Sequence, residues 1–258
     1  MELALDAYAD LDSPLHRWEP RMRLVGLVGL IFAFAFVQHL WLLPVMAASA
    51  LTLYGAAQFP LSFLWKRLRS PGFFLLMMAF MLPFLSGSTV MLHIGPLALR
   101  REGSLDTVLI VTKFVSIMTV GLILFGTAPF LTTIEAMRAL GLPPVLADMT
   151  LFSYRYIYEI GGDLATMRTA MGLRGFRDHR LSGRSLGVLA SLAGSILVRS
   201  YEQSERVYKA MILRGYGQSS RPPDHDHVQF YDWLLLGFVL LVAGGLIAGE
   251  VLLRRSGG

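Results

Sequence analysis

Two arginines, Arg174 and Arg214, stand in the same local sequence. The chain reads AMGLRGF over residues 170–176 and AMILRGY over residues 210–216, so that Ala, Met, Arg and Gly recur in the same order and spacing. A guanidinium is a permanently charged, planar group whose fork of N–H donors matches a carboxylate through paired hydrogen bonds. The chemistry that this repeat indicates is recognition of an acidic group on a partner.

Helical spacing gives each copy of the repeat a common face. Residues three, four and seven positions apart lie on one side of a helix. The first copy therefore aligns Met167, Ala170 and Arg174, and in each copy a small residue lets another backbone come close to the arginine. The second copy aligns the equivalent residues, which are Val207, Ala210 and Arg214.

A glycine follows each arginine directly, and glycine commonly ends a helix in a left-handed cap. In a purely structural interpretation, Arg-Gly only ends two helices, at Gly175 and Gly215, and the cation complements the helix dipole. This interpretation suffices for one copy of a short motif. Two copies with the same stripe favour a shared binding surface.

A third version of the motif lacks the arginine. The chain reads AMRALG over residues 136–141, with Leu140 in the arginine position, and Pro143 and Pro144 follow the glycine. Glycine and proline together predict a helix end there. We therefore expect three short helices, two of them ending on an arginine.

The composition is that of a membrane protein. Of the 258 residues 54% are hydrophobic, and the mean hydropathy of +0.55 lies outside the range of soluble domains. A transmembrane helix needs about 20 mainly apolar residues. Five segments are expected to span the lipid bilayer: 24–42, 43–59, 73–92, 105–125 and 233–253.

The motifs lie in an interval where charges interrupt every apolar run. This interval is expected to form amphipathic helices at or below the membrane surface. The predicted organisation is an all-α integral membrane protein with an N-terminal tail and four spans in residues 1–126, a coupling-helix region in residues 127–230, and a last span in residues 231–258. Twelve Arg or Lys residues in the interval place it in the cytoplasm by the positive-inside rule.

Several classes of function are disfavoured by the sequence. There is no GxxxxGK[ST] phosphate loop and no HExxH zinc motif, so the chain is not expected to hydrolyse nucleotide or to act as an enzyme. The absence of cysteine excludes disulfides and iron–sulfur clusters. Arginine outnumbers lysine by 20 to 3, which suits paired carboxylate recognition better than nucleic-acid binding.

Three smaller features have structural explanations. Lys113 lies in a predicted span on the face of Asp106, and we expect it to reach the membrane surface or a neighbouring helix. Arg155 and Glu159 are four residues apart and could form an ion pair on one helix. The stretch DHDH over residues 224–227 has metal-ligand residue types, but two histidines in a loop seldom complete a site. No metal or other cofactor is therefore expected in this chain.

The sequence resembles a known transporter subunit. Besides the two arginine motifs, the stretches DSPLHRWEP (12–20), LTTIEAMRALGLPP (131–144) and YRYIYEI (154–160) are similar to the transmembrane T component of energy-coupling factor (ECF) transporters, in particular its cobalt branch, CbiQ. The resemblance covers nearly the whole chain.

The resemblance implies a non-catalytic scaffold. It implies that the chain contacts two ABC-type ATPase subunits, which use the ATP, and a membrane S component, which binds the substrate. The residues expected at the ATPase contacts are Ala170, Met171, Arg174, Gly175, Ala210, Met211, Arg214 and Gly215. The family often has Ala before Arg-Gly, whereas this chain has Leu173 and Leu213.

The expected location is the cell (inner) membrane, and the expected substrate is cobalt. Nickel, biotin or another vitamin is the alternative, because specificity would lie in another chain. A membrane enzyme or a stand-alone carrier is the remaining class. Such a protein should show a cluster of carboxylates or histidines within the membrane, and the sequence has none that we could identify.

Overall fold

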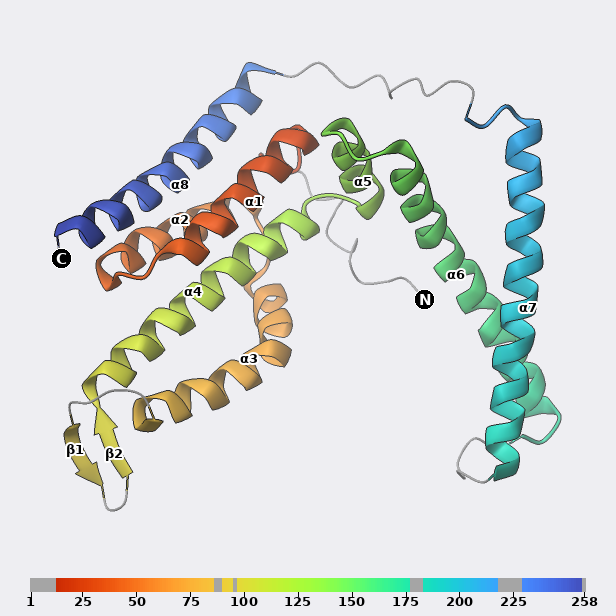
Figure 1. Cartoon of the computed structure of the whole chain (residues 1–258), viewed down its shortest axis with the longest axis horizontal. Helices are drawn as coiled ribbons and strands as arrows, with labels where there is room; N and C mark the ends of the chain where they lie inside the picture. Colours follow the sequence, from red (N-terminus) through yellow and green to blue (C-terminus); the bar gives the residue numbers. More distant parts are fainter. Residues whose placement is uncertain (1–12, 86–89, 95–96, 177–182, 218–228, 257–258) are drawn as a thin grey trace. The chain divides into compact units, whose positions relative to one another are not determined.

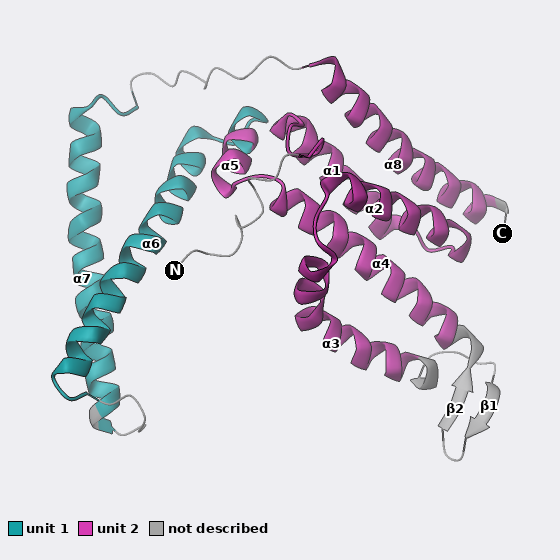
Figure 2. Cartoon of the chain, turned by 180° about the vertical axis from the view of Figure 1, so that it is seen from behind, with its two compact units in different colours: residues 1, 137–225 teal, residues 2–136, 226–258 magenta. Residues whose placement is uncertain are grey.

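The chain divides into two helical units. The computed structural model describes residues 13–85, 90–94, 97–176, 183–217 and 229–256. The bundle unit comprises Glu2–Ala136 together with Asp226–Gly258, and the α6–α7 unit comprises Met137–His225 (Figure 2). The all-α class is confirmed, with one small antiparallel strand pair, β1 and β2, at Val90–Ile94 and Leu97–Arg100 (Figure 1).

Besides this strand pair, the described residues form eight α-helices and one short 3-10 helix. The bundle unit holds α1 (Pro20–Phe36), η1 (Leu40–Leu42), α2 (Leu43–Ala57), α3 (Leu61–Leu85), α4 (Arg101–Gly126), α8 (Phe230–Ser256) and most of α5 (Phe130–Ala139). The α6–α7 unit holds the end of α5 and two long helices, α6 (Pro144–Leu173) and α7 (Gly183–Leu213).

Helix α1 lies at the centre of the bundle unit and packs against α4 and α8. Glu19 begins it, because its side chain accepts a hydrogen bond from the Met22 N–H at 3.0 Å and Pro20 holds the first helical position. Leu27, Leu30 and Phe34 point into the core and are fully buried. At Gly26, an added Cβ would come within 3.2 Å of Trp18 and 3.3 Å of Leu236, so the absent side chain permits close packing.

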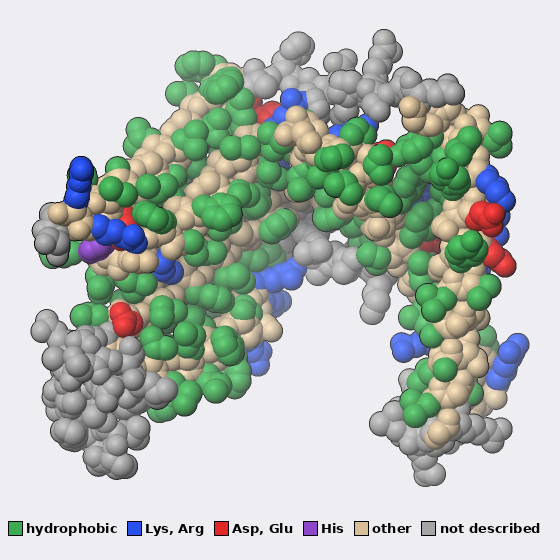
Figure 3. Space-filling model, in the orientation of Figure 1, with side chains coloured by type: hydrophobic (Ala, Val, Ile, Leu, Met, Phe, Trp, Pro, Cys, Tyr) green, Lys and Arg blue, Asp and Glu red, His purple; other side chains and the backbone are tan. Residues whose placement is uncertain are grey.

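The outward faces of the bundle unit are apolar. Four large apolar side chains show this, since each is about 70% exposed: Phe32, Leu51, Phe74 and Phe80. In Figure 3, hydrophobic side chains cover much of the visible face of this unit, while charged side chains gather along α7. A water-soluble protein seldom exposes a continuous apolar surface of this kind, so these faces are suited to lipid.

Three of the expected spans are confirmed as helices long and apolar enough to cross a membrane. Within the described residues these segments are Leu40–Ala57, Gly103–Gly126 and Phe230–Arg255. The other two expectations need correction: the segment expected over 24–42 ends its helix at Phe36, and the segment expected over 73–92 is replaced by α3, which ends at Leu85, and by β1. The count of five spans is not confirmed.

A buried carboxylate accounts for the early end of α1. The backbone N–H groups of Gln38 and His39 donate to Glu250 Oε2 at 2.9 and 3.1 Å. In a longer α1, these N–H groups would instead donate to backbone carbonyls of the preceding turn. His39 Nδ1 and Arg254 Nε contact Glu250 Oε1 at 2.9 and 3.1 Å. The Glu250 side chain is fully buried. Its hydrogen bonds connect the segment between α1 and η1 to the end of α8.

Helices α6 and α7 run antiparallel. Asp163 pairs with Arg199 at 3.3 Å, and Glu159 accepts a hydrogen bond from Gln203 at 2.7 Å. Residue numbers therefore decrease along α6 as they increase along α7. The expected ion pair between Arg155 and Glu159 is wrong, since within the described residues Glu159 bonds across to α7 instead. The hydrogen bond from Gln203 gives the Glu159 carboxylate a partner on α7. An exposed ion pair with Arg155 on the same helix would contribute little stability.

Of the three short helices expected in this region, α5 is short, with 10 residues, but the expectation is wrong for the two helices that end on an arginine. Helices α6 and α7 contain 30 and 31 residues. The charged residues that interrupt the apolar runs stop a membrane span, but they do not stop a helix. Polar residues can instead serve contacts between two amphipathic helices, as they do at Asp163 and Arg199.

We predict that Glu250→Ala lowers the melting temperature of the purified full-length chain. The change leaves the N–H groups of Gln38 and His39 without their acceptor, and a buried unsatisfied donor costs about 1–3 kcal/mol. Thermal unfolding in detergent measures the effect. The control is Glu205→Ala, which removes an exposed carboxylate that pairs with Lys209 on the surface of α7 and should leave melting nearly unchanged. Equal melting of the two variants would contradict the anchoring role of Glu250.

Candidate functional site

The two repeated arginines lie at opposite ends of the α6–α7 pair. Arg174 follows the last residue of α6, and Arg214 follows the last residue of α7. Tyr216, two residues after Arg214, donates a hydrogen bond to Asp148, so Asp148 marks the level of the Arg214 end along α6. Arg174 comes 26 residues after Asp148. At 1.5 Å per residue, the two arginines are therefore about 39 Å apart along the helix axis.

The first arginine sits in a well-formed helix cap. The Gly175 N–H donates to the Gly172 carbonyl at 3.0 Å, and the Phe176 N–H donates to the Met171 carbonyl at 3.0 Å. Gly175 has φ of +85°, which is the left-handed conformation that glycine adopts at low cost. These are the two hydrogen bonds of a Schellman motif, so the predicted glycine cap is confirmed.

The second arginine has the same cap. The Gly215 N–H donates to the Ile212 carbonyl at 2.9 Å and the Tyr216 N–H to the Met211 carbonyl at 3.0 Å. Gly215 has φ of +78°. The two copies of the sequence motif therefore encode two copies of one local structure.

The third copy shows which part of the motif the cap needs. Gly141 has φ of +109°, and the N–H groups of Gly141 and Leu142 donate to the carbonyls of Arg138 and Met137 at 3.2 and 3.0 Å. The same cap forms here with Leu140 in the arginine position. Helix termination thus accounts for the glycine, but it does not require the arginine.

Both guanidinium groups are free to meet a partner. Arg174 and Arg214 are exposed, as are Ala170 and Ala210 one turn earlier. Within the part of the chain that the structure describes, neither arginine side chain has an ion pair or a hydrogen bond. An unpaired guanidinium on a surface can bind a carboxylate without first breaking an internal contact.

The leucines before the arginines are further residues of these tips, and sequence reasoning treated them only as departures from a pattern. Leu173 and Leu213 are 87% and 88% exposed. Each tip therefore presents an apolar side chain beside a cation. The signal in the sequence was the identical Leu-Arg-Gly order, in which the leucine precedes the helix end and has no core to enter.

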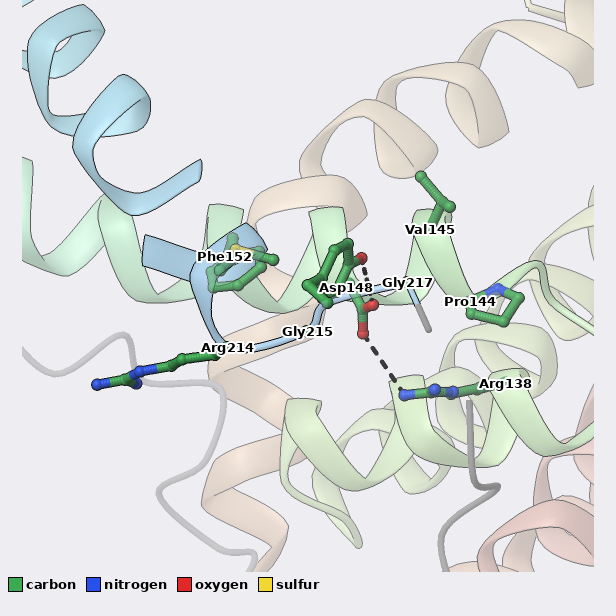
Figure 4. A pocket seen from close by; sticks show the side chains of 10 residues that line it. Arg138, Pro144, Val145, Asp148, Phe152, Arg214, Gly215 and Gly217 are labelled. Atoms are coloured by element: carbon green, nitrogen blue, oxygen red, sulfur yellow. Dashed lines mark hydrogen bonds and ion pairs between the residues drawn. The ribbon is translucent and has the colours of Figure 1, made fainter. Parts of the chain in front are cut away.

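The Arg214 end also borders a groove. The groove has a volume of about 690 Å³ and is formed by the end of α5, the start of α6 and the end of α7 (Figure 4). In its wall, Asp148 accepts hydrogen bonds from the Tyr216 hydroxyl at 2.6 Å and from Arg138 at 3.5 Å. The hydrogen bond to the Asp148 carboxylate raises the pKa of Tyr216, because it stabilises the protonated phenol. Figure 4 shows the Arg214 side chain extending away from this pair.

The smaller sequence features do not form a second site. Lys113 Nζ donates to the Ala35 carbonyl of α1 at 2.8 Å, which confirms the expected contact with a neighbouring helix. Among the residues described, no three His, Cys, Asp or Glu side chains form a group that could hold a metal ion. The stretch 224–227 lies outside the described residues.

One further pattern in the sequence proves to be structural. Residues 183–187 read GRSLG, which matches the GxSxG pattern of serine hydrolases. That site requires the serine on a tight turn between a strand and a helix. Ser185 instead lies in the first turn of α7, so the match does not indicate a nucleophile.

Comparison with known proteins identifies the family. The model of the CbiQ family, described as cobalt transport proteins, matches residues 12–224, which include all three caps. The chain belongs to the CbiQ family.

Relatives of the family cover most of the chain. It is 25% identical to the energy-coupling factor transporter transmembrane protein EcfT of Limosilactobacillus fermentum, over 96% of this chain and 97% of the relative. It is 26% identical to the cobalt transport protein CbiQ of Rhodobacter capsulatus, over 65% and 68%. The CbiQ-family chain is thus a membrane component of a transporter, the T component of the ECF class in its cobalt branch.

We predict that Gly175→Ala lowers the melting temperature of the full-length chain. The added Cβ meets open space, but it must adopt the left-handed conformation, which costs about 1–2 kcal/mol. Gly194→Ala is the matched control, because Gly194 lies inside α7 and also faces open space. Alanine there should raise stability by about 0.5–1 kcal/mol. Opposite shifts of the two melting temperatures are expected, and a rise for both would contradict the cap.

Proposed function

We propose that this CbiQ-family chain transmits ATP-driven movement from two ABC-type ATPase subunits to a separate membrane subunit that binds the substrate. The observation that carries the proposal is the two exposed guanidinium groups at opposite ends of the α6–α7 pair, which have no ion pair or hydrogen bond among the described residues. In this proposal, Arg174 and Arg214 each contact one ATPase, and the neighbouring alanine, methionine and glycine of each motif shape the contact.

The separation of the two tips supports two partners. About 39 Å along the axis is several times the Debye length of about 8 Å at physiological salt, so each guanidinium acts on its own surroundings. One compact acidic site cannot reach both. Two ATPase subunits, each offering one acidic groove, would match the two ends.

The composition of the tips supports a contact that can transmit force. Each tip combines a guanidinium with a leucine that is almost fully exposed. Burying the leucine would remove water from the contact, and truncating one partner of a desolvated charge pair costs about 2–5 kcal/mol. A helix that ends in such a contact would follow its ATPase partner when ATP closes the two subunits.

Cobalt is the proposed substrate, and a separate S component would bind the ion. The family description and the name of the Rhodobacter capsulatus relative support cobalt. The name of the Limosilactobacillus fermentum relative gives no substrate, and that relative covers more of the chain. A T component for another micronutrient, such as nickel, biotin or another vitamin, therefore remains the second candidate.

We predict that Arg174→Ala and Arg214→Ala each reduce cobalt uptake by cells that express the chain with its ATPase and S components, and that the double variant abolishes uptake. Loss of one contact at about 2 kcal/mol would weaken ATPase binding about thirtyfold. Copurification of the ATPase subunits and uptake of radioactive cobalt measure the two effects. Uptake at the parental rate with both arginines replaced would refute the proposal.

The matched control for these variants is Arg168→Ala. Arg168 is also an exposed arginine of α6, but it stands six residues before Arg174 and therefore on another face. Its removal changes the net charge equally. Uptake and copurification should remain near the parental values, so that a general effect of charge is separated from loss of the tip.

The proposed cytoplasmic location of the tips can be tested by labelling. The chain has no cysteine, so each introduced thiol is unique. We expect Leu173→Cys to react with a membrane-impermeant maleimide only when the cytoplasmic face is accessible. Trp41→Cys, at a side chain 85% exposed between α1 and α2, should react only from the opposite face. Labelling of both thiols from one face would contradict the proposed orientation.

A further inference from the structure

The aromatic residues that close the two arginine caps differ by one hydroxyl group. The residue after the capping glycine is Phe176 at the first end and Tyr216 at the second, and both donate the same backbone hydrogen bond to a methionine carbonyl. The phenylalanine has no polar group. The tyrosine hydroxyl donates to Asp148 Oδ2 at 2.6 Å, so only the second end has this hydrogen bond to the neighbouring helix.

Asp148 connects three segments of the α6–α7 unit. It lies in the second turn of α6, it accepts the Tyr216 hydroxyl from the cap of α7, and its other oxygen pairs with Arg138 at the end of α5 at 3.5 Å. Arg138 and Asp148 are 24% and 20% exposed, so solvent screens this pair only in part. In Figure 4, a dashed line joins the Asp148 carboxylate to Arg138.

We propose that Tyr216 and Asp148 form a latch that holds the Arg214 end of α7 against the start of α6, and that Arg138 orients the aspartate. The latch makes the two tips mechanically unequal: Arg214 is presented from a fixed end, whereas Arg174 is presented from an end without this hydrogen bond. Tyr216, Asp148 and Arg138 are positioning residues. This inference rests on the proposed function for its consequence, but not for its structural part.

The latch has a direct consequence for transmission of movement. Tyr216 follows Arg214 by two residues. A force on the Arg214 side chain is therefore transmitted through the backbone of the cap to Tyr216 and its hydroxyl group. Asp148 passes it to α6, and Arg138 passes it to the end of α5. The chain continues from α5 through residues 127–129 to α4. The Arg214 end is thus the better connected of the two to the helix that enters the membrane.

The structural part is tested by distance measurements on the full-length chain in lipid nanodiscs. Spin labels on Leu140→Cys and Leu213→Cys report the spacing between the end of α5 and the end of α7, and both leucines are exposed. We expect a narrow distance distribution in the parent. Tyr216→Phe, which installs the natural residue of the other cap, should increase the fraction of separated ends about fivefold, as loss of a charge-assisted hydrogen bond does.

Two further variants identify the interaction. Asp148→Ala should broaden the distribution at least as much as Tyr216→Phe, and the double variant should add little to Asp148→Ala because one hydrogen bond is lost in both. Labels on Leu173→Cys and Leu186→Cys report the other end of the pair, where Tyr216→Phe should change nothing. A parental distribution in Tyr216→Phe, or equal broadening at both ends, would overturn the latch.

The functional part is tested by the ratio of cobalt transported to ATP hydrolysed in the reconstituted complex. Tyr216→Phe should lower this ratio several-fold while the ATPase subunits still copurify, because Arg214 is retained. Phe176→Tyr is the matched control and should leave the ratio unchanged. Broadened distances with a parental ratio would overturn the positioning role. Failure of the arginine variants to affect uptake would instead refute the proposed function and leave the distance test intact.

Discussion

The structure of the candidate site depends on how α6 and α7 end. Each helix closes with a glycine in the left-handed conformation, which turns the chain at once and leaves the preceding arginine at the tip of the helix. If the helix continued, the arginine would lie along its side, where i+4 neighbours surround it. Because the turn follows directly, the guanidinium and its leucine project from an end that a partner can enclose.

Antiparallel pairing then turns two equal caps into two separate sites. Parallel helices of the same length would bring both arginines to one end, where two cations would repel each other. In this chain, cross-contacts such as Asp163 with Arg199 set the opposite direction. A repeated sequence therefore produces two similar tips about 39 Å apart rather than one doubly charged surface. Both tips lie within the region that matches the CbiQ family model.

The bundle unit uses polar groups where its apolar helices need fixed ends. Glu250 satisfies two backbone N–H groups beside α1, and Arg23 donates to the carbonyls of Leu15 and Thr127 at 3.2 and 3.1 Å, joining the N-terminal segment to the end of α4. Leu and Phe side chains pack without strong directional preference. The few buried polar groups add direction, because an unmet donor or acceptor in an apolar setting is costly.

The sequence by itself determined the membrane class, the three helices that are long and apolar enough to cross a membrane, and the three helix caps, because hydropathy and glycine act locally. It also determined the family, through motifs that stand close together in the chain. It did not determine where α1 ends, since that depends on Glu250, more than 200 residues later. The lengths of α6 and α7, the partner of Glu159 and the contact of Tyr216 with Asp148 were decided only by the tertiary structure. Each of these depends on which helix lies opposite, and local pattern carries no record of the neighbour across the pair.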